Sequence, residues 1–255
     1  MTRYLHLSAF MAALLFATAA GAVEPRSGYD FLPPEFQAMQ DDPFENPGMF
    51  TVDLGRELFN APGDDGTSCA TCHGADGEQL RPARIARYPV FSPKLNGPVT
   101  LQKQIDLCRE ERMNEFPLTY DDPSLVALET FVRHRARGEP VKVDVSGPMQ
   151  PYYKEGERLF RTRIGQLQMA CSHCHEQYTG AMLRDQLLNQ AQTNAFPTHR
   201  LLTQDISSLH RKLRDCFATL RAMPFQPGSE EYINLEVYMN ARGNGLPIET
   251  PGIRR

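Results

Sequence analysis

The stretch that decides the fold is Cys-Ala-Thr-Cys-His at residues 69–73, which has a counterpart, Cys-Ser-His-Cys-His, at residues 171–175. The pattern C-x-x-C-H is typical of c-type haem attachment, in which both thiols bond to the haem and the histidine binds its iron. One copy alone is also compatible with a redox pair or half of a zinc site. However, a zinc site does not require histidine directly after the second cysteine in both copies, and a thioredoxin-like pair needs a βαβ context. We therefore predict two haems c, covalently held by Cys69, Cys72, Cys171 and Cys174, with His73 and His175 as iron ligands.

The two halves of the chain match outside these motifs as well. Gly-Arg-Glu-Leu-Phe at residues 55–59 corresponds to Gly-Glu-Arg-Leu-Phe at residues 156–160, and each predicts an amphipathic helix before its motif. After each motif, one helical face carries Leu101, Ile105 and Cys108 or, in the second half, Leu209, Leu213 and Cys216. A last helix is predicted in each half, capped by Asp122 or Ser229 and ended by Gly138 or Gly245. The predicted fold class is mainly α, with two tandem cytochrome c-like helical domains related by an internal repeat.

The N-terminal region has the pattern of an export signal. Arg3 precedes an apolar run at residues 7–20, and Ala-Gly-Ala at residues 20–22 is a small-residue cleavage site. We expect a signal peptide at 1–22, an N-terminal arm at 23–47, a first cytochrome domain at 48–143 and a second at 144–255, in a periplasmic protein. The arm is acidic and rich in proline, which is compatible with disorder, but its aromatic residues also allow it to pack along a domain.

Charge and hydropathy exclude two classes of partner. The chain has 27 basic and 31 acidic residues, and no basic cluster dominates, which argues against nucleic acid. The N-terminal apolar run is too short to cross a bilayer, and no later stretch is long and apolar enough. We therefore expect a protein that does not span the membrane.

The sixth ligand of each iron is the next question, and the sequence leaves two answers open. Methionine is the usual distal ligand, and Met223, directly before Pro224, resembles the distal loop of ordinary cytochromes. In the first half the corresponding residue is Phe116, which cannot bind iron, and Met113 does not align with Met223. What recurs in both halves is a cysteine, Cys108 or Cys216, on the apolar face of a helix.

Other interpretations of these two cysteines remain. A lone cysteine often packs as a small apolar side chain, and a disulfide between Cys108 and Cys216 is possible if the repeats face each other there. Thiolate ligation stabilises ferric iron, so two such haems make a poor general electron carrier.

No histidine recurs at matching positions outside the motifs, so we interpret His134, His199 and His210 as surface or packing residues and His173 as a spacer.

These residues resemble the SoxA subunits of SoxAX cytochromes, over nearly all of the chain that follows the signal peptide. The most specific parts are residues 96–109 with Cys108, residues 170–175, and the tail at 227–247. The resemblance implies the dihaem form, with His73 and His175 as proximal ligands and Cys108 and Cys216 as distal ligands. It further implies that Cys216 is the active-site cysteine. Where the family usually has arginine, four residues before that cysteine, this chain has Lys212, next to Arg211, and both are candidate substrate-binding residues.

The resemblance also implies an activity and partners. SoxA-like proteins pair with the small cytochrome SoxX and act as an L-cysteine S-thiosulfotransferase, which oxidatively joins thiosulfate to a cysteine of the carrier protein SoxYZ. The product is a cysteine S-thiosulfonate, and two electrons leave through haem to cytochrome c. The alternatives are a periplasmic dihaem electron carrier with Met223 as a distal ligand and no turnover, and a haem-based sensor. Cys216 discriminates among them, because only the enzyme needs a reactive thiolate beside a cationic cluster.

Overall fold

The computed structural model describes residues 24–255, so the predicted signal peptide at 1–22 lies outside the described residues. The helical elements are η1 (Gly28–Phe31), α1 (Pro34–Asp41), α2 (Met49–Asn60), α3 (Cys69–His73), α4 (Pro82–Ile85), α5 (Leu101–Met113), α6 (Pro123–His134), η2 (Gly147–Met149), α7 (Gln150–Arg161), η3 (His173–Gln177), α8 (Leu209–Thr219) and α9 (Glu230–Arg242). The strands are short: β1 (Val90–Ser92), β2 (Gly97–Val99), β3 (Met182–Leu183), β4 (Gln186–Leu187), β5 (Thr198–Arg200), β6 (Asp205–Ser207) and β7 (Gly252–Arg254). The mainly α fold class is confirmed.

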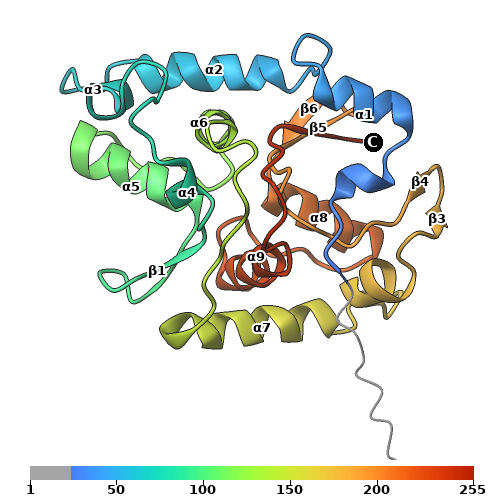
Figure 1. Cartoon of the computed structure of the whole chain (residues 1–255). Helices are drawn as coiled ribbons and strands as arrows, with labels where there is room; N and C mark the ends of the chain where they lie inside the picture. The colour runs from blue at the N-terminus through green and yellow to red at the C-terminus, as the bar shows by residue number, and fades with distance from the viewer. Residues whose placement is uncertain (1–23) are drawn as a thin grey trace, which may run out of the picture.

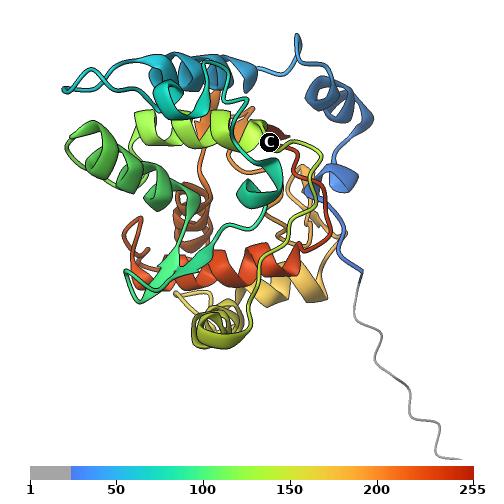
Figure 2. The ribbon, with the colours of Figure 1, turned by 60° about the vertical axis from the view of Figure 1, so that its left-hand side comes forward.

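The helices form layers in which the same order of elements occurs twice. α2 lies along one edge of the molecule and α7 along the opposite edge, with α6 and α9 between them (Figures 1 and 2). Each series runs from a first helix (α2 or α7) through a C-x-x-C-H turn (α3 or η3) and a β-hairpin to a cysteine-bearing helix (α5 or α8) and a last helix (α6 or α9). This order agrees with the repeat expected from the sequence.

The first and last helices of each series cross at a glycine. A Cβ atom added to Gly55 of α2 would lie 2.1 Å from the carbonyl oxygen of Ala127 in α6. A Cβ added to Gly156 of α7 would lie 2.0 Å from the carbonyl oxygen of Asn234 in α9. Glycine therefore permits a backbone approach that no other residue allows at these two crossings.

Apolar side chains gather in two clusters, one for each series. Phe59 is buried in the first cluster, where its ring centroid lies 5.0 Å from that of Phe131. Phe160 is buried in the second cluster, 5.3 Å from the ring of Tyr238. The matching Gly-x-x-x-Phe segments thus place one buried aromatic ring in each apolar cluster.

The predicted capping residues of the last helices do cap them. Asp122 accepts a hydrogen bond from the backbone N–H of Ser124 at the start of α6, and Ser229 accepts one from Tyr232 at the start of α9. The expected helix ends are wrong by a few residues, because α6 ends at His134 and α9 at Arg242. Gly138 and Gly245 instead lie in the turns that follow, with φ of +88° and +91°.

The N-terminal arm is ordered and packs against the C-terminal half. The amide of Asn46 donates to the carbonyl oxygen of Pro251 at 2.9 Å, and the hydroxyl of Ser27 donates to Glu249 at 2.8 Å. Gln40, only 1 % exposed, accepts a hydrogen bond of 2.8 Å from the backbone of Ile253. Of the two alternatives for this arm, packing along a domain is therefore the one observed.

The small sheets were not predicted. β1 and β2 form an antiparallel hairpin before α5, and β5 and β6 form one before α8. β7, near the C-terminus, joins β5 in parallel. No helix among residues 24–255 combines the length and the apolar character needed to cross a membrane.

Candidate functional site

The first predicted haem site is a cavity of about 400 Å³ between α3, α5 and α6. Cys69 and His73 of α3 line it together with Cys108 of α5. Its other walls are mostly apolar and include Phe59, Leu80, Ile85, Leu101, Ile105, Leu128 and Val132. Burial raises the pKa of the Cys69 thiol to about 11, and the nearby Cys108 adds to the effect.

The lining of this cavity fits a haem. A haem is a large apolar ring that carries two carboxylates, and the cavity has apolar walls and two guanidinium groups, from Arg81 and Arg84. Cys69 and His73 of one short helix and Cys108 of another provide one attachment thiol and two potential iron ligands. The second attachment thiol, Cys72, lies on the same short helix as Cys69, is exposed and does not line the cavity. Sequence reasoning did not identify the two arginines, because they lie outside the motif and its repeat.

The second predicted site is built around His175. Its Nδ1 lies 2.7 Å from the carbonyl oxygen of Asn189, so Nδ1 carries the hydrogen and Nε2 is left free to bind a metal. Burial lowers the pKa of His175, the hydrogen bond opposes this effect, and the charges of Arg242 and Lys212 add to it. A neutral imidazole is the form that binds iron, so this environment fits a proximal ligand.

Three thiols gather at the second site. Burial and, to a smaller extent, the neighbouring Cys216 raise the pKa of Cys171 to about 12. Cys216 also raises the pKa of Cys174, after burial. The structure thus brings together Cys171, Cys174 and Cys216, from η3, the segment before it and α8. Like the first site, it offers attachment thiols and one additional cysteine.

The residue before the second cysteine of each motif has a local structural role. Thr71 Oγ1 accepts a hydrogen bond from the backbone of Ser68 at 3.0 Å. His173 Nδ1 accepts one from the backbone of Ala170 at 2.8 Å. Both side chains fold back onto the residue before the first cysteine, which agrees with the interpretation of His173 as a spacer.

The two predicted substrate-binding cations have different surroundings. Arg211 lies at the surface, with its guanidinium 2.5 Å from Asp205 and 3.4 Å from the carbonyl oxygen of Ile206. Lys212 is half-buried and forms no ion pair with any residue in 24–255, and its charge reaches His175. Of the two, Lys212 is therefore the residue whose charge acts on His175 at the second site, as that of Arg242 also does, whereas Arg211 is bound to the β5–β6 hairpin.

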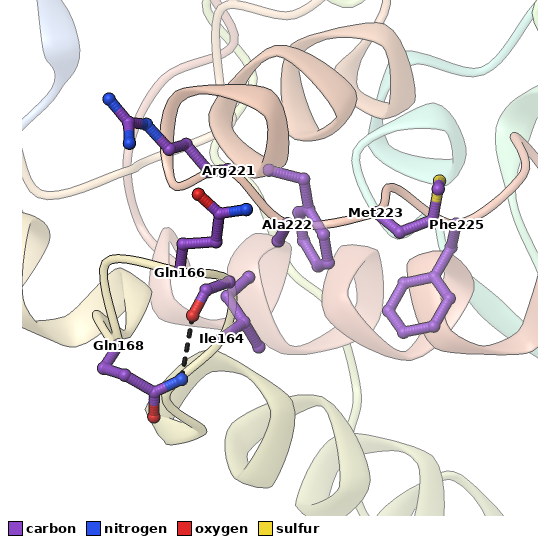
Figure 3. Close-up of a pocket in the computed structure, with 9 residues that line it drawn as sticks. Ile164, Gln166, Gln168, Arg221, Ala222, Met223 and Phe225 are labelled. Carbon is purple, nitrogen blue, oxygen red and sulfur yellow. Dashed lines mark hydrogen bonds between the residues drawn. The ribbon is translucent and has the colours of Figure 1, made fainter.

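Met223, the rival ligand, lies at the surface. Its side chain is 89 % exposed and lines an open hollow of about 600 Å³ between the segments 164–168 and 217–225 (Figure 3). Phe116, the corresponding residue of the first half, is 84 % exposed. None of the predicted haem ligands lines this hollow. In this structure Cys216, rather than Met223, lies among the second set of predicted ligands.

The cysteines do not form disulfides. All six lie within the described residues and are free thiols. Cys108 lies near Cys69 and Cys216 near Cys171, so each belongs to its own half of the molecule. Within residues 24–255, no three or more His, Cys, Asp or Glu side chains lie close enough to hold a bare metal ion, although Cys216 lies near enough to affect the pKa values of Cys171 and Cys174.

Comparisons with known proteins agree with this geometry. Residues 54–141 match the family model described as the SoxA/TsdA cytochrome c domain. The chain is 38% identical to the L-cysteine S-thiosulfotransferase subunit SoxA of Pseudaminobacter salicylatoxidans, over 91% of this chain and 82% of that protein. It is 37% identical to the corresponding subunit of Rhodovulum sulfidophilum, over 91% and 80%. The crystal structure of SoxXA from P. pantotrophus superposes with a TM-score of 0.84 at 31% identity, covering 91% of this chain and 87% of that chain. This chain, with a cytochrome c cavity in its first half and relatives matched over both halves, belongs to the SoxA family.

Proposed function

We propose that the chain is the catalytic subunit of an L-cysteine S-thiosulfotransferase, the activity named for its relatives. It would join thiosulfate to a cysteine of a SoxYZ-like carrier protein. The observation that carries this proposal is the convergence of Cys216, His175 and the half-buried Lys212 at one site. A plain electron carrier has no need of an unpaired cation beside its ligand thiolate.

The proposed cofactors are two covalently bound haems c. Cys69 and Cys72 would hold the first and Cys171 and Cys174 the second, with His73 and His175 as proximal ligands and Cys108 and Cys216 as distal ligands. The apolar cavity with Arg81 and Arg84 supports the first assignment. The hydrogen bond from His175 to Asn189, which orients the imidazole, supports the second. The proposed domain boundaries remain 48–143 and 144–255, with one haem in each domain.

The reaction requires a sulfur–sulfur bond and the removal of two electrons. Thiosulfate carries two negative charges and the carrier thiolate carries one, while the S-thiosulfonate product carries one. A haem held by Cys171, Cys174 and His175 would supply the route by which these two electrons leave toward the partner cytochrome. The chain's own contribution is to hold both anions beside Cys216, whose sulfur can take part in thiol exchange chemistry.

Lys212 has the role of reducing repulsion in this step. Two anions that approach a thiolate repel one another, and an ammonium group nearby offsets part of this cost. Arg211 contributes positive charge at longer range, because its guanidinium is engaged by Asp205. We therefore assign the direct substrate contact to Lys212 and a secondary role to Arg211.

The proposed setting is the periplasm, with a SoxX-like small cytochrome as partner. The similarity to the crystal structure of SoxXA from P. pantotrophus supports this partner. The apolar run at residues 7–20 supports export. The competing function, an electron carrier with Met223 as ligand, has less support, because Met223 is 89 % exposed.

Replacement of each of the two cysteines outside the C-x-x-C-H motifs tests the proposal. With the SoxX-like partner and the carrier protein present, Cys216→Ala should abolish thiosulfate-dependent electron release, measured as haem reduction. Cys108→Ala is the matched control, because it removes the equivalent cysteine from the other half, and it should retain activity. Equal loss in both variants, with both proteins folded, would contradict the assignment of the reaction to the second site.

A further inference from the structure

Arg242, the last residue of α9, joins three other parts of the second half of the chain. Its Nη1 donates a hydrogen bond of 3.0 Å to the carbonyl oxygen of Gln190. Its Nη2 lies 3.6 Å from the carboxylate of Glu176. Its guanidinium lies over the ring of Phe160, with 4.7 Å between Cζ and the ring centroid. One side chain of α9 thus contacts α7, η3 and the segment that follows the β3–β4 hairpin.

Two of these contacts are next to the groups that set the orientation of His175. Glu176 directly follows His175 in the chain. Gln190 directly follows Asn189, whose carbonyl oxygen lies 2.7 Å from His175 Nδ1. A single planar group, the guanidinium of Arg242, therefore binds both the neighbour of the imidazole and the neighbour of its hydrogen-bond acceptor.

The segment that carries this acceptor is a tight turn held by several contacts. Ala191 has a φ of +56°, in the left-handed region that a residue with a side chain rarely adopts. The side-chain oxygen of Asn189 accepts a hydrogen bond of 2.8 Å from the backbone of Ala191. The side-chain oxygen of Gln190 accepts one of 2.8 Å from the backbone of Arg26 in the N-terminal arm. The bond from Arg242 to the Gln190 carbonyl lies at the centre of this turn, where it constrains the direction of the preceding carbonyl.

The repeat shows that these contacts are more than the usual cation at a helix end. Phe131 of α6 matches Tyr238 of α9, and in the same register Arg135 matches Arg242. A cation at this position favours the C-terminal end of a helix in either half. Arg135 is exposed and forms no ion pair with any residue in 24–255, whereas Arg242 pairs with Glu176. The contacts around the histidine therefore belong to the second half.

We propose that Arg242 is a positioning residue for His175, because it fixes the carbonyl group that accepts the Nδ1 hydrogen of this histidine. The inference rests on the proposed function, in which His175 is the proximal ligand of the second haem. A hydrogen bond from the other ring nitrogen orients a metal-binding histidine and makes it a stronger donor. A stronger donor favours ferric iron, so a well-placed Asn189 carbonyl should lower the reduction potential of that haem.

Charge alone is the competing explanation for any effect of Arg242 on the second site. Its positive charge adds to burial in lowering the pKa of His175. Lysine keeps this charge but lacks the planar fork that binds Gln190 and Glu176 together. Arg242→Lys therefore separates the effect of position from the effect of charge.

The haem-loaded protein and two variants test the proposal. In Arg242→Lys the reduction potential of the second haem, measured by spectroelectrochemical titration, should rise while that of the first stays the same. The low-spin electron paramagnetic resonance signal of the second haem should broaden, because the imidazole takes more than one orientation. Asn189→Ala removes the bond to Ala191 without a change of charge, so it should shift the potential in the same direction. Arg135→Lys is the matched control and should leave both haems as in the wild type.

These measurements use neither thiosulfate nor the carrier protein, so a failure of the proposed activity would not be mistaken for a failure of this inference. A wild-type potential and signal in Arg242→Lys, even with a lower Tm, would overturn the proposal, because Arg242 would then only stabilise the fold. If Arg242→Lys does not retain its second haem, Asn189→Ala supplies the test, and a wild-type potential in that variant would overturn the proposal equally.

Discussion

The side-chain amide of Gln104 donates a hydrogen bond of 3.3 Å to the sulfur of Cys108. The residue that occupies the same position in the second half, four residues before Cys216, is Lys212. Residues four apart on a helix lie on one face, so each of the two proposed ligand cysteines has a polar side chain one turn away. The donor is neutral in the first half and cationic in the second. This difference supports the proposal that the second site binds the anionic substrate.

Removal of the cation should therefore slow the reaction without damage to the haems. A charge-assisted contact is worth about 1.5–3 kcal/mol, so we predict that Lys212→Ala lowers kcat/KM about ten- to a hundredfold. Lys212→Arg should retain most activity, and Arg211→Ala should cost less, because Arg211 is paired with Asp205. The measurement is thiosulfate-dependent haem reduction at low salt, with spectra of both haems as the folding control. Full activity in the Lys212→Ala variant would contradict the assignment of Lys212 as a substrate-binding residue.

The glycine crossings give a prediction for stability. Gly55→Ala and Gly156→Ala would each force a Cβ to within about 2 Å of a backbone oxygen on the opposite helix. Overpacking of this kind costs about 1–3 kcal/mol, so thermal unfolding should show a lower Tm for both variants. Gly97→Ala is the control, because the nearest atom to its added Cβ is 3.7 Å away. An unchanged Tm in Gly55→Ala would show that α2 and α6 do not cross as closely as described.

Mass spectrometry of the denatured protein tests the number of attached haems. We expect two haems per chain and no disulfide, because both motifs are intact and all six cysteines are free in the structure. Replacement of Cys69 and Cys72 with alanine should remove one haem, and replacement of Cys171 and Cys174 should remove the other. A Cys108–Cys216 crosslink in a digest would contradict the assignment of both as ligands.

Much of the fold could be predicted because short-range signals mark it. Aspartate and serine are favoured at the N-terminal cap of a helix. The structure uses Asp122 and Ser229 in this way. The spacing of Leu101, Ile105 and Cys108 places them on one helical face without any knowledge of the rest of the chain. The glycine and phenylalanine of α2 recur in α7 because both pairs of helices cross in the same way.

What could not be predicted depends on contacts between distant parts of the chain. The N-terminal arm packs because Asn46 and Gln40 find partners at Pro251 and Ile253, more than two hundred residues away. Arg211 and Lys212 are adjacent in the sequence and carry the same charge. Only the position of the β5–β6 hairpin reveals that Arg211 forms an ion pair with Asp205. The sequence indicates a surface or packing role for His210, and its contact with Glu236 becomes visible only when α8 and α9 are placed together.

The central claim is that thiolates, and Cys216 in particular, are the distal ligands, and electron paramagnetic resonance of the ferric protein tests it most directly. A thiolate is an anionic ligand that stabilises ferric iron, whereas methionine raises the potential. We predict two low-spin signals of the thiolate-ligated type, both retained in Met223→Leu. Cys216→Met should remove one of them and raise the potential of that haem. Conversion of the second haem to a high-spin form in Met223→Leu, with the Cys216→Met spectrum unchanged from wild type, would contradict the account.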